Sequence, residues 1–511
     1  MSERKKLVWL ICIAFLIKCI TAITVELGND EVYYLTYAQH LQWNYFDHPP
    51  MVALLIRLTT FNLFFINELF IRLGPILLAA INTLLIFNLA KKIKNEQAGF
   101  IAALLFTASP YCSIIAGTFI LPDAPQLFFW ILSISLSSDI ALLPCGTKQL
   151  NYKLLLFGLF SGLCIMSKVH GCFLWIGLGA FILLYRRNML RNVYLYFSII
   201  ITAIIVVPIL IWNIENNFIT YTFHSERVSI NNGLQADSFI RELAGGILYN
   251  NPITWFLIVI AVSGTFKNKL FITIAVKRIL LLLSLPMIGL LFFISLFRDT
   301  LPHWSGPAYI PLLIISAVYI SSKLETKKQT GVRLYRFSFL ANIFLLIIIA
   351  AGITVINFMP GNIGKKDVVF SGDGDFTLDM YGWNDIKRKF KKTYDADKAS
   401  GKTATSFIIN NKWFPGSHID NYIAQPLKLD FIAIGELNDI HTYAWLNQYR
   451  KKINKGDDAY FVTVSNNFCD PVQKYMGLFE TINKPVIIPQ LRSGIPVRNI
   501  FIYLLKNYNE N

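Results

Sequence analysis

Charged residues are scarce in this chain. Only 15% of its 511 residues are Asp, Glu, Lys or Arg, whereas 54% are hydrophobic. A soluble globular protein carries nearer ~25% charged residues, so the composition argues against a soluble fold. The chain also lacks GxxxxGK[ST], GxGxxG, HExxH and GxSxG motifs where they could work. Their absence argues against ATP-driven transport, nucleotide-sugar chemistry, and serine or zinc hydrolysis.

Cysteine is sparse as well, with seven residues and no CxxC pair. Most of these cysteines lie in or beside apolar segments, and only Cys469 falls in the polar C-terminal part. We therefore expect them to act as small hydrophobic residues. The formal net charge is +16, but the basic residues lie mostly between hydrophobic segments. This placement predicts membrane topology and contacts with anionic headgroups, and it argues against nucleic-acid binding.

Long hydrophobic runs are what the chain has in abundance. Examples are Leu7–Ile23, Leu73–Ala90, Ile279–Phe297 and Phe337–Ile356. Each is close to the ~20 residues that a helix needs to cross the hydrocarbon core, so we predict a polytopic α-helical membrane protein with about eleven transmembrane helices. The predicted spans cover residues 7–25, 69–90, 97–117, 124–143, 154–167, 171–185, 192–212, 252–266, 279–297, 304–321 and 337–357.

The basic residues fall on one side of the membrane under this threading. Arg4, Lys5 and Lys6 place the N-terminus in the cytoplasm, and an apolar stretch without an A-x-A-like cleavage site predicts an uncleaved first span. Residues 1–357 then form a membrane domain with long outer loops at 26–67 and 213–250. In the first loop, 30–43 and 51–65 are predicted to be amphipathic interfacial helices separated by two prolines.

Residues 358–511 change in composition. They are polar and mixed in charge, and they contain short β-like runs at 405–409, 430–434 and 460–464. A helical stretch at 383–393 precedes these runs. The alternation predicts a small extracytoplasmic C-terminal α/β domain.

Asp30 and Glu31 directly follow the first span, within NDEVYY. A carboxylate at membrane depth can deprotonate an acceptor hydroxyl or orient it, so we predict catalytic roles for both residues. An alternative is helix capping, since acids are favoured in a first helical turn.

Two further acids stand beside prolines. In YFDHPP, Asp47 and His48 are held on a stiff turn, where they could bind a divalent metal or a phosphate. In LPDAP, Asp123 opens the fourth span as its N-cap, and we also predict a catalytic role for it. For YFDHPP the alternative is a plain helix-terminating turn.

Lys168 and His170 occupy the outer turn between the fifth and sixth spans. A lysine outside runs against positive-inside statistics, and a phosphate is a natural partner for it. A lysine that reaches to the interface is the alternative.

Other cations and histidines follow in the later outer loops. Arg227 and Arg298 are the best guanidinium candidates for a phosphate or diphosphate, and His303 in LPHW is a further substrate-binding candidate. His224 and His303, with Asp47, are the candidate ligands if a metal is present.

An ordered set of motifs resembles one known group. The set is NDEVYY, YFDHPP, RLGPILLAAINTLLIFNLAKK, TFILPDAPQLFFW, GLCIMSKVHG, PILIWNIENNF, PHWSGPAYIPL and LDMYGWNDI. In this order the motifs, over roughly residues 1–400, resemble bacterial members of the GT-C glycosyltransferase superfamily. The branch is that of the protein O-mannosyltransferases and the aminoarabinose (lipid A) transferases.

The resemblance implies transfer of a sugar from an undecaprenyl-phosphate carrier to an envelope acceptor such as lipid A, at the outer face of the bacterial inner membrane. Asp30, Asp47 and Asp123 match acids of that group, and His48 stands where the aminoarabinose branch carries Lys. No nucleotide cofactor is implied, and a divalent metal stays open. Direct displacement at the anomeric carbon would invert its configuration.

Other functions stay open. A protein acceptor would make the chain a protein O-glycosyltransferase of the same family. A transporter or lipid flippase is a different class, but it would carry charges and broken helices at mid-depth. A structural envelope protein would need no carboxylates directed at the membrane. We expect the three carboxylates to converge in one pocket beside phosphate-binding cations.

Overall fold

The computed structural model describes residues 1–228, 233–266, 271–326 and 329–509, and the side chains of 226–228 fall outside that description. It divides into two compact units. The first comprises Met1–Ala22 and Leu41–Ile349, and the second comprises Ile23–His40 and Ala350–Asn511. The boundary near residue 358 stays a sequence prediction. The contacts also assign segment 23–40 to the same unit as the C-terminal residues, which the sequence did not predict.

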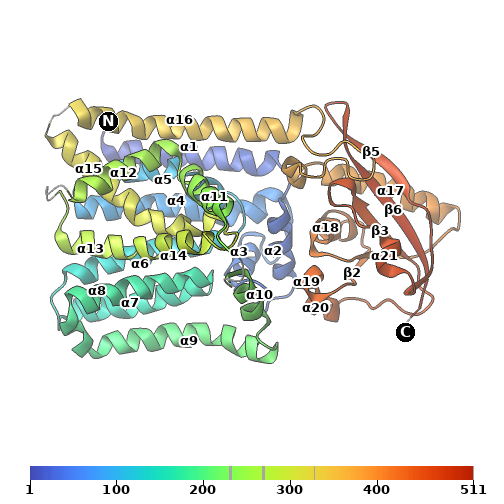
Figure 1. Cartoon of the computed structure of the whole chain (residues 1–511), viewed down its shortest axis with the longest axis horizontal. Coiled ribbons are helices and arrows are strands. Elements are labelled where there is room, and N and C mark those ends of the chain that lie inside the picture. The colour runs from blue at the N-terminus through green and yellow to red at the C-terminus, as the bar shows by residue number, and fades with distance from the viewer. Residues whose placement is uncertain (229–232, 267–270, 327–328, 510–511) are drawn as a thin grey trace. The chain divides into compact units, whose positions relative to one another are not determined.

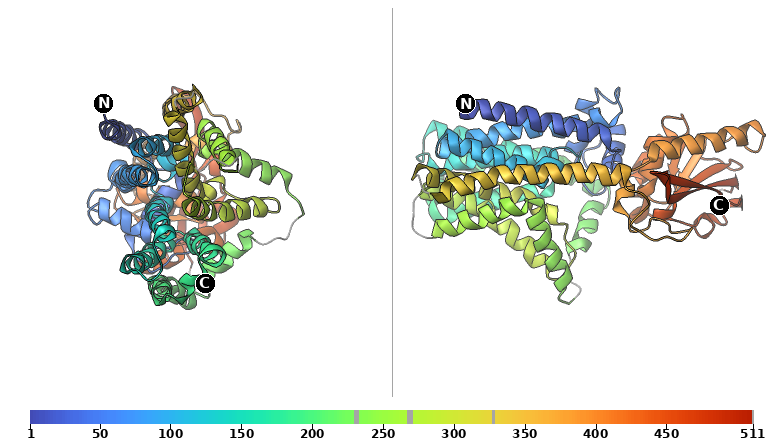
Figure 2. Two further views of the ribbon diagram at one scale, coloured as in Figure 1. Left: turned by 90° about the vertical axis from the view of Figure 1, so that its left-hand side faces the viewer. Right: turned by 90° about the horizontal axis from the view of Figure 1, so that it is seen from above.

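Long helices that run side by side make up the first unit, seen lengthwise in Figure 1 and nearly end-on in the left view of Figure 2. They are α1 (Glu3–Thr24), α4 (Glu68–Ile93), α5 (Glu96–Ala108), α6 (Asp123–Leu142), α7 (Lys148–Ile165), α8 (Cys172–Tyr185), α9 (Val193–Glu215), α12 (Pro252–Phe266), α13 (Ile274–Leu282), α14 (Leu285–Ser295), α15 (Ile310–Glu325) and α16 (Gln329–Phe358). Shorter elements are α3 (Met51–Thr59), η1 (Tyr111–Ile115), η2 (Val169–Gly171), η3 (Arg187–Arg191), α10 (Ile219–Val228), α11 (Ala236–Tyr249) and η4 (Pro302–Tyr309).

The membrane spans agree with the hydropathy of the sequence. Within the described ranges, seven helices are long and apolar enough to cross a membrane, and α11 with α12 forms a further pair bent by 96°. The predicted spans fall on these helices or on the shorter α5, α7 and α8. Span 97–117 continues past the end of α5 at Ala108 into η1, and span 279–297 covers parts of α13 and α14. The polytopic helical fold class is therefore confirmed.

Several hydroxyl side chains inside the bundle bond to their own helix. Thr83 donates to the carbonyl of Ala79 at 2.8 Å, and Ser316 donates to that of Leu312 at 2.7 Å. A hydroxyl that bonds one turn back needs no water, so it is tolerated among apolar neighbours. The remainder of the bundle core is aliphatic and aromatic.

The two helices predicted for the first outer loop are present. They are α2 (Asn29–Gln39) in the second unit and α3 in the first. In α3 the buried residues follow a helical period, as expected for an amphipathic helix. In α2, eight consecutive residues from Glu31 to Ala38 are buried, so the predicted amphipathic character of this helix is wrong. Partners distant in the sequence cover it, and periodicity does not reveal them.

The second unit is built on a six-stranded sheet, with α17 visible beside it in Figure 1. The order is β2-β1-β3-β6-β4, and β5 also pairs with β6. The strands are β1 (Phe407–Asn410), β2 (Asp430–Ala433), β3 (Ala459–Val464), β4 (Phe479–Ile482), β5 (Val486–Arg492) and β6 (Ile495–Tyr508). Its helices are α2, η5 (Phe376–Met380), α17 (Trp383–Ala399), α18 (Trp413–His418), η6 (Ile419–Ala424), α19 (Leu437–Ile440), α20 (Tyr443–Leu446), η7 (Asn447–Tyr449), η8 (Ser465–Asn467) and α21 (Pro471–Tyr475).

Strand direction explains which strands the sequence revealed. β1 pairs in parallel with β2 and β3, and all residues of β1 and β3 are buried. Parallel strands covered on both faces are short apolar runs, so β1, β2 and β3 were predictable. Strands β4, β5 and β6 have only antiparallel partners. β5 and β6 each contain a proline, Pro489 and Pro496, which argues against a strand in the sequence, and these three strands were not predicted.

Candidate active site

An enclosed ion pair joins two of the predicted site residues. The Nζ of Lys168 lies 2.8 Å from Oδ2 of Asp123, and the two side chains are only 4% and 3% exposed. The phenolic hydroxyl of Tyr111 donates to Oδ1 of the same carboxylate at 3.1 Å. Both carboxylate oxygens are therefore occupied. Each charge depends on its partner, because either alone would be a desolvated ion.

Two chain reversals place this group, the one between α5 and α6 and the one between α7 and α8. Asp123 begins α6 directly after Pro122, and Lys168 follows α7, where its backbone N–H bonds to the carbonyl of Cys164 at 3.0 Å. Tyr111 begins the π-helix η1, an irregular helix type that is frequent at functional sites. The sequence identified Asp123 and Lys168 separately. It did not predict that they pair, nor that Tyr111 completes the group.

Two predicted histidines lie close to this ion pair. The charges of Asp123 and Lys168 act on both His170 and His303. The ring of His170 lies 5.7 Å from that of Trp304, between centroids. Its Nδ1 is buried and has no hydrogen-bond partner among the described residues. An unpaired buried nitrogen beside an ion pair suits a ligand-binding position.

The element that carries His303 is fixed by close packing. η4 lies against α11, where a Cβ added to Gly245 would come within 2.1 Å of the Cβ of Pro302. Glycine is therefore required at this approach. From α11, Glu242 accepts a hydrogen bond from Thr300 at 2.7 Å, just ahead of η4. Both contacts hold His303 in place.

The YFDHPP turn meets α10 through a histidine. Nε2 of His224 lies 2.7 Å from the backbone oxygen of Asp47, so this nitrogen carries the proton and donates. The rings of His48 and His224 are 6.0 Å apart. In the described part of the chain, no group of three or more His, Cys, Asp or Glu side chains is placed to hold a metal ion. The metal candidates Asp47, His224 and His303 thus do not form such a cluster.

Asp30 and Glu31 lie in the second unit, at the start of α2. An oxygen of Glu31 accepts from the backbone N–H of Gly28 at 2.8 Å, so this carboxylate caps its own helix. Asp30 is exposed in the same turn. Asp47 and Asp123 belong to the first unit. The predicted convergence of all three acids therefore stays a prediction.

Of the two predicted phosphate-binding arginines, the structure describes the side chain of Arg298 and not that of Arg227. Arg298 is half-buried at the end of the segment after α14, and its backbone oxygen accepts from the hydroxyl of Ser238 at 2.7 Å. Arg227 lies outside the residues whose side chains are described. Phosphate binding by either residue stays a prediction.

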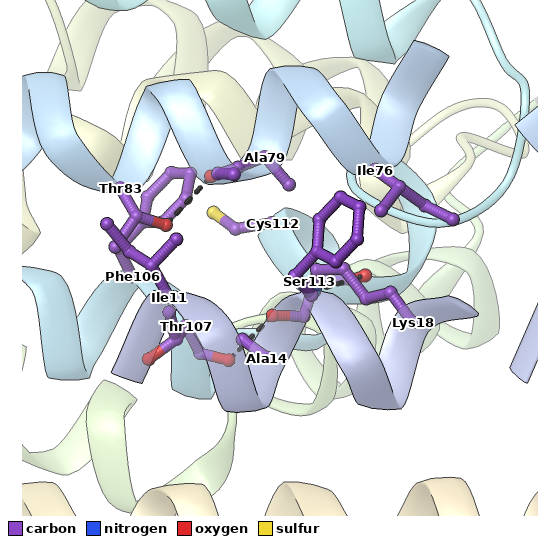
Figure 3. A pocket seen from close by; sticks show the side chains of 12 residues that line it. Ile11, Ala14, Lys18, Ile76, Ala79, Thr83, Phe106, Thr107, Cys112 and Ser113 are labelled. Atoms are coloured by element: carbon purple, nitrogen blue, oxygen red, sulfur yellow. Dashed lines mark hydrogen bonds between the residues drawn. The ribbon is translucent and has the colours of Figure 1, made fainter. Parts of the chain in front are cut away.

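Lys18 is a buried cation that the sequence analysis did not single out. It lies within α1, is 6% exposed, and donates from Nζ to the carbonyl of Ser113 in η1 at 3.0 Å. Figure 3 shows Lys18 and Ser113 on the wall of a small pocket between α1, α4 and η1. The signal available was a lysine inside an otherwise apolar span. Its contact supports the π-helix that carries Tyr111.

Comparisons with known proteins agree with this architecture. Residues 47–212, which contain Asp123 and Lys168, match the model of a family described as dolichyl-phosphate-mannose-protein mannosyltransferase. The lipid A galacturonosyltransferase RgtD of Rhizobium johnstonii is 26% identical over 315 residues, which make up 60% of this chain and 62% of that relative. The chain thus matches less than two thirds of the relative's length.

The fold is shared with solved structures over nearly the whole chain. ArnT from Cupriavidus metallidurans in the apo state matches with a TM-score of 0.64 and 12% identity, covering 98% of both chains. The same protein bound to undecaprenyl phosphate matches with a TM-score of 0.61 and 14% identity, over 98% of both chains. At 12–14% identity these matches show the fold alone, and the chain has the fold of ArnT. The resemblance inferred from the ordered motifs is confirmed by the family match and by the relative RgtD together with this fold.

Proposed function

We propose that this protein is an integral-membrane glycosyltransferase. It moves a sugar from a polyprenyl-phosphate carrier, of the undecaprenyl kind, to lipid A or a related envelope glycolipid. The observation that carries the proposal is the enclosed pair of Asp123 and Lys168, which lies inside the segment that matches the mannosyltransferase family. Such a pair suits a site that must hold a phosphate away from bulk water.

Lys168 is the group we assign to the donor phosphate. An ammonium has three N–H donors, and the hydrogen bond to Asp123 uses one of them. The other two can bind the phosphate oxygens as the sugar leaves. Asp123 is unsuited to act as the base, since its two oxygens accept from Tyr111 and Lys168. We assign it to holding the ammonium in place.

The proposed reaction is a single displacement. The acceptor hydroxyl oxygen forms a bond to the anomeric carbon, while the bond from that carbon to the phosphate oxygen breaks. The electron pair of the broken bond leaves with the polyprenyl phosphate, and the hydroxyl proton passes to a carboxylate. Asp30 is our candidate for this base, because its side chain is exposed, whereas Glu31 is buried and caps its own helix. Attack opposite the leaving group inverts the anomeric carbon.

We place the protein in a bacterial inner membrane with the Asp123 end of α6 on the periplasmic side. Asp139, one turn before the other end of α6, lies among Lys92 and Lys153. Basic residues favour the cytoplasmic end of a span. The opposite end, with Asp123, then faces the compartment in which lipid-linked sugars are used.

The acceptor has a second candidate. The matching family is described by transfer to protein, so a protein hydroxyl is the alternative to lipid A. The relative RgtD is described by lipid A and favours the lipid. Candidate donor sugars are galacturonic acid, aminoarabinose and mannose, each linked to undecaprenyl phosphate.

The test is transfer by purified protein in nanodiscs, with each labelled donor and with lipid A or a Ser/Thr-rich peptide as acceptor. We expect label on lipid A. Lys168→Met should lower the rate at least ~100-fold, because it removes the charge that stabilises the leaving group. The matched control is Asp139→Asn at the other end of the same helix, with near wild-type transfer expected. Label on the peptide would select the alternative acceptor. Movement of the donor between leaflets without a new bond would overturn the proposal in favour of a flippase.

A further inference from the structure

The backbone of one residue near Asp30 is held from both sides by the C-terminal part of the chain. The N–H of Leu27 donates to the hydroxyl of Tyr422 at 2.8 Å, and the carbonyl oxygen of Leu27 lies 3.0 Å from Nε2 of His418. Leu27 is 3% exposed. Both polar groups of this buried peptide therefore have side-chain partners from residues almost 400 positions away. We call this arrangement the Leu27 clasp.

His418 is itself locked in place. Its ring is fully buried and stacks on Trp383 at 4.0 Å between centroids, with Tyr422 stacked at 6.0 Å. The guanidinium of Arg498 covers Trp383 at 4.6 Å. Burial lowers the pKa of His418 to about 3, so the ring is neutral and Nε2 carries the donated proton. A ring packed in this way cannot turn to follow the backbone.

A carboxylate anchors the residue before the clasp. The two oxygens of Glu26 accept from the backbone N–H of Trp383 at 2.6 Å and of Asn384 at 3.0 Å. These are N–H groups of the first turn of α17, which have no partner within that helix. A negative charge is favoured at this end of a helix. Segment 23–40 thus supplies the cap of a helix in the C-terminal part.

The far end of α2 is held as well. Oε1 of Gln39 accepts from Arg450 at 2.8 Å, and the same guanidinium pairs with the buried Asp420 at 2.6 Å. Midway, the carbonyl of Val32 accepts from the amide of Asn421 at 3.2 Å. The helix that begins beside Asp30 is therefore fixed at its start, middle and end by residues of the second unit.

We infer that His418 and Tyr422 are positioning residues for the transfer reaction, and that the C-terminal part of the chain serves to hold the base Asp30 at a fixed place. Asp30 follows the clasped peptide by three residues, within the first turn of α2. A shift of the clasp moves that turn as a rigid piece. The inference rests on the proposed function, because it gives Asp30 a reaction to serve.

The experiment compares three variants with a matched control. His418→Phe keeps an aromatic ring on Trp383 and removes the donor, His418→Gln restores an N–H donor, and Tyr422→Phe removes the hydroxyl. The control is Tyr475→Phe. Tyr475 is equally buried and donates its hydroxyl to the carbonyl of Ile434 at 3.1 Å, within the same unit but away from residues 23–40.

We expect His418→Phe and Tyr422→Phe to lower kcat by about 10- to 100-fold with KM for the lipid donor unchanged, because displacement of a reacting group by ~1 Å has effects of this size. His418→Gln should recover part of the loss, and Tyr475→Phe should keep kcat. Hydrogen exchange of peptides from 24–40 should become faster in His418→Phe and Tyr422→Phe and stay unchanged in Tyr475→Phe. A kcat loss that merely follows the melting temperature, with Tyr475→Phe equally affected, would overturn the inference.

Failure of the proposed function gives a different result. In that case wild-type protein transfers no sugar, or Asp30→Asn keeps full activity, while hydrogen exchange still reports whether the clasp holds residues 24–40. Suppose that wild-type protein is active and Asp30→Asn is inactive. Full activity of His418→Phe and Tyr422→Phe would then reject the positioning role and leave the proposed function intact.

Discussion

The two ends of α6 carry the same residue type in different surroundings. At its start, Asp123 is enclosed with a single cation, Lys168, and both side chains are almost inaccessible. Toward its end, Asp139 pairs with Lys153 at 2.9 Å and also with Lys92, whose side chain is 57% exposed. An exposed lysine can exchange its partner for water or a lipid headgroup, whereas an enclosed one cannot. The difference fits our proposal that the first pair serves the site and the second supports membrane topology.

The largest expected effect comes from breaking the enclosed pair. Lys168→Met should destabilise the protein by ~3–5 kcal/mol, because it leaves the Asp123 carboxylate buried without a counter-ion. Lys153→Met should cost less than ~1 kcal/mol, since Asp139 keeps Lys92. Thermal and denaturant unfolding in detergent measure both. Adding Asp123→Leu to Lys168→Met should restore most of the stability, and equal losses for the two lysine variants would remove the distinction between the two ends.

A half-buried acid and a buried histidine of the second unit should make stability depend on pH. Burial raises the pKa of Asp379 to about 6 from its ordinary 3.8, and burial lowers the pKa of His418 to about 3 from 6.5. Asp379 stabilises the fold at low pH, and this contribution is lost as pH rises from about 4 to 6. His418 stabilises the fold above about 6.5, and its contribution is lost as pH falls toward 3. Between about pH 4 and 6 the two effects oppose each other.

Substitution of one group leaves the pH dependence of stability that is due to the other. In Asp379→Asn, stability should fall as pH drops from 6.5 to 4, by up to ~1.4 kcal/mol per pH unit relative to wild type. In His418→Gln, stability should fall as pH rises over the same range. Melting temperatures from pH 4 to 7 test both slopes. Two variants that stay parallel to wild type would show that neither group titrates as described.

A smaller effect is expected at the cap of α17. Glu26→Gln should cost about 1 kcal/mol, because it removes the negative charge that accepts from the first N–H groups of this helix. The matched control is Asp395→Asn, a half-exposed acid on the same helix that pairs with Lys391. Circular dichroism during thermal unfolding compares the two. An equal loss of stability in both variants would show that the Glu26 cap contributes no more than an exposed ion pair.

Local pattern was enough for much of the fold. The spans were visible as apolar runs, strands β1, β2 and β3 as short runs of β-branched and aromatic residues, and α17 as a polar helical stretch. Asp123 was visible as an acid between two prolines at the start of a span, and Lys168 as a lysine on an outer turn, where positive-inside statistics disfavour it. These features depend on neighbours in the sequence, which a single chain displays directly.

Long-range partners could not be predicted. The hydrogen bond from His418 to Leu27 spans 391 positions, and the one from Lys168 to Asp123 spans 45. No partner of α2 is visible in the sequence, and segment 30–43 was therefore predicted to be an amphipathic helix at the interface. In the structure Tyr33 lies 5.0 Å from Trp413 between ring centroids. Contacts between residues so far apart in the sequence depend on the tertiary fold, and a periodic sequence pattern does not predict them.

The smallest effect should come from an exposed ion pair next to Arg298. Arg241 lies 2.9 Å from Asp299, with side chains 55% and 70% exposed. Asp299→Asn should change the free energy of unfolding by less than ~0.5 kcal/mol, because water already solvates both charges and ordering two side chains offsets their attraction. Raising the salt from 0.05 to about 0.5 M should remove even that difference, since the screening length falls below the range of surface pairs. Unfolding at both salt concentrations, beside Lys168→Met, gives the comparison. If Asp299→Asn lost nearly as much free energy of unfolding as Lys168→Met, burial would not determine how much an ion pair contributes to the stability of this protein.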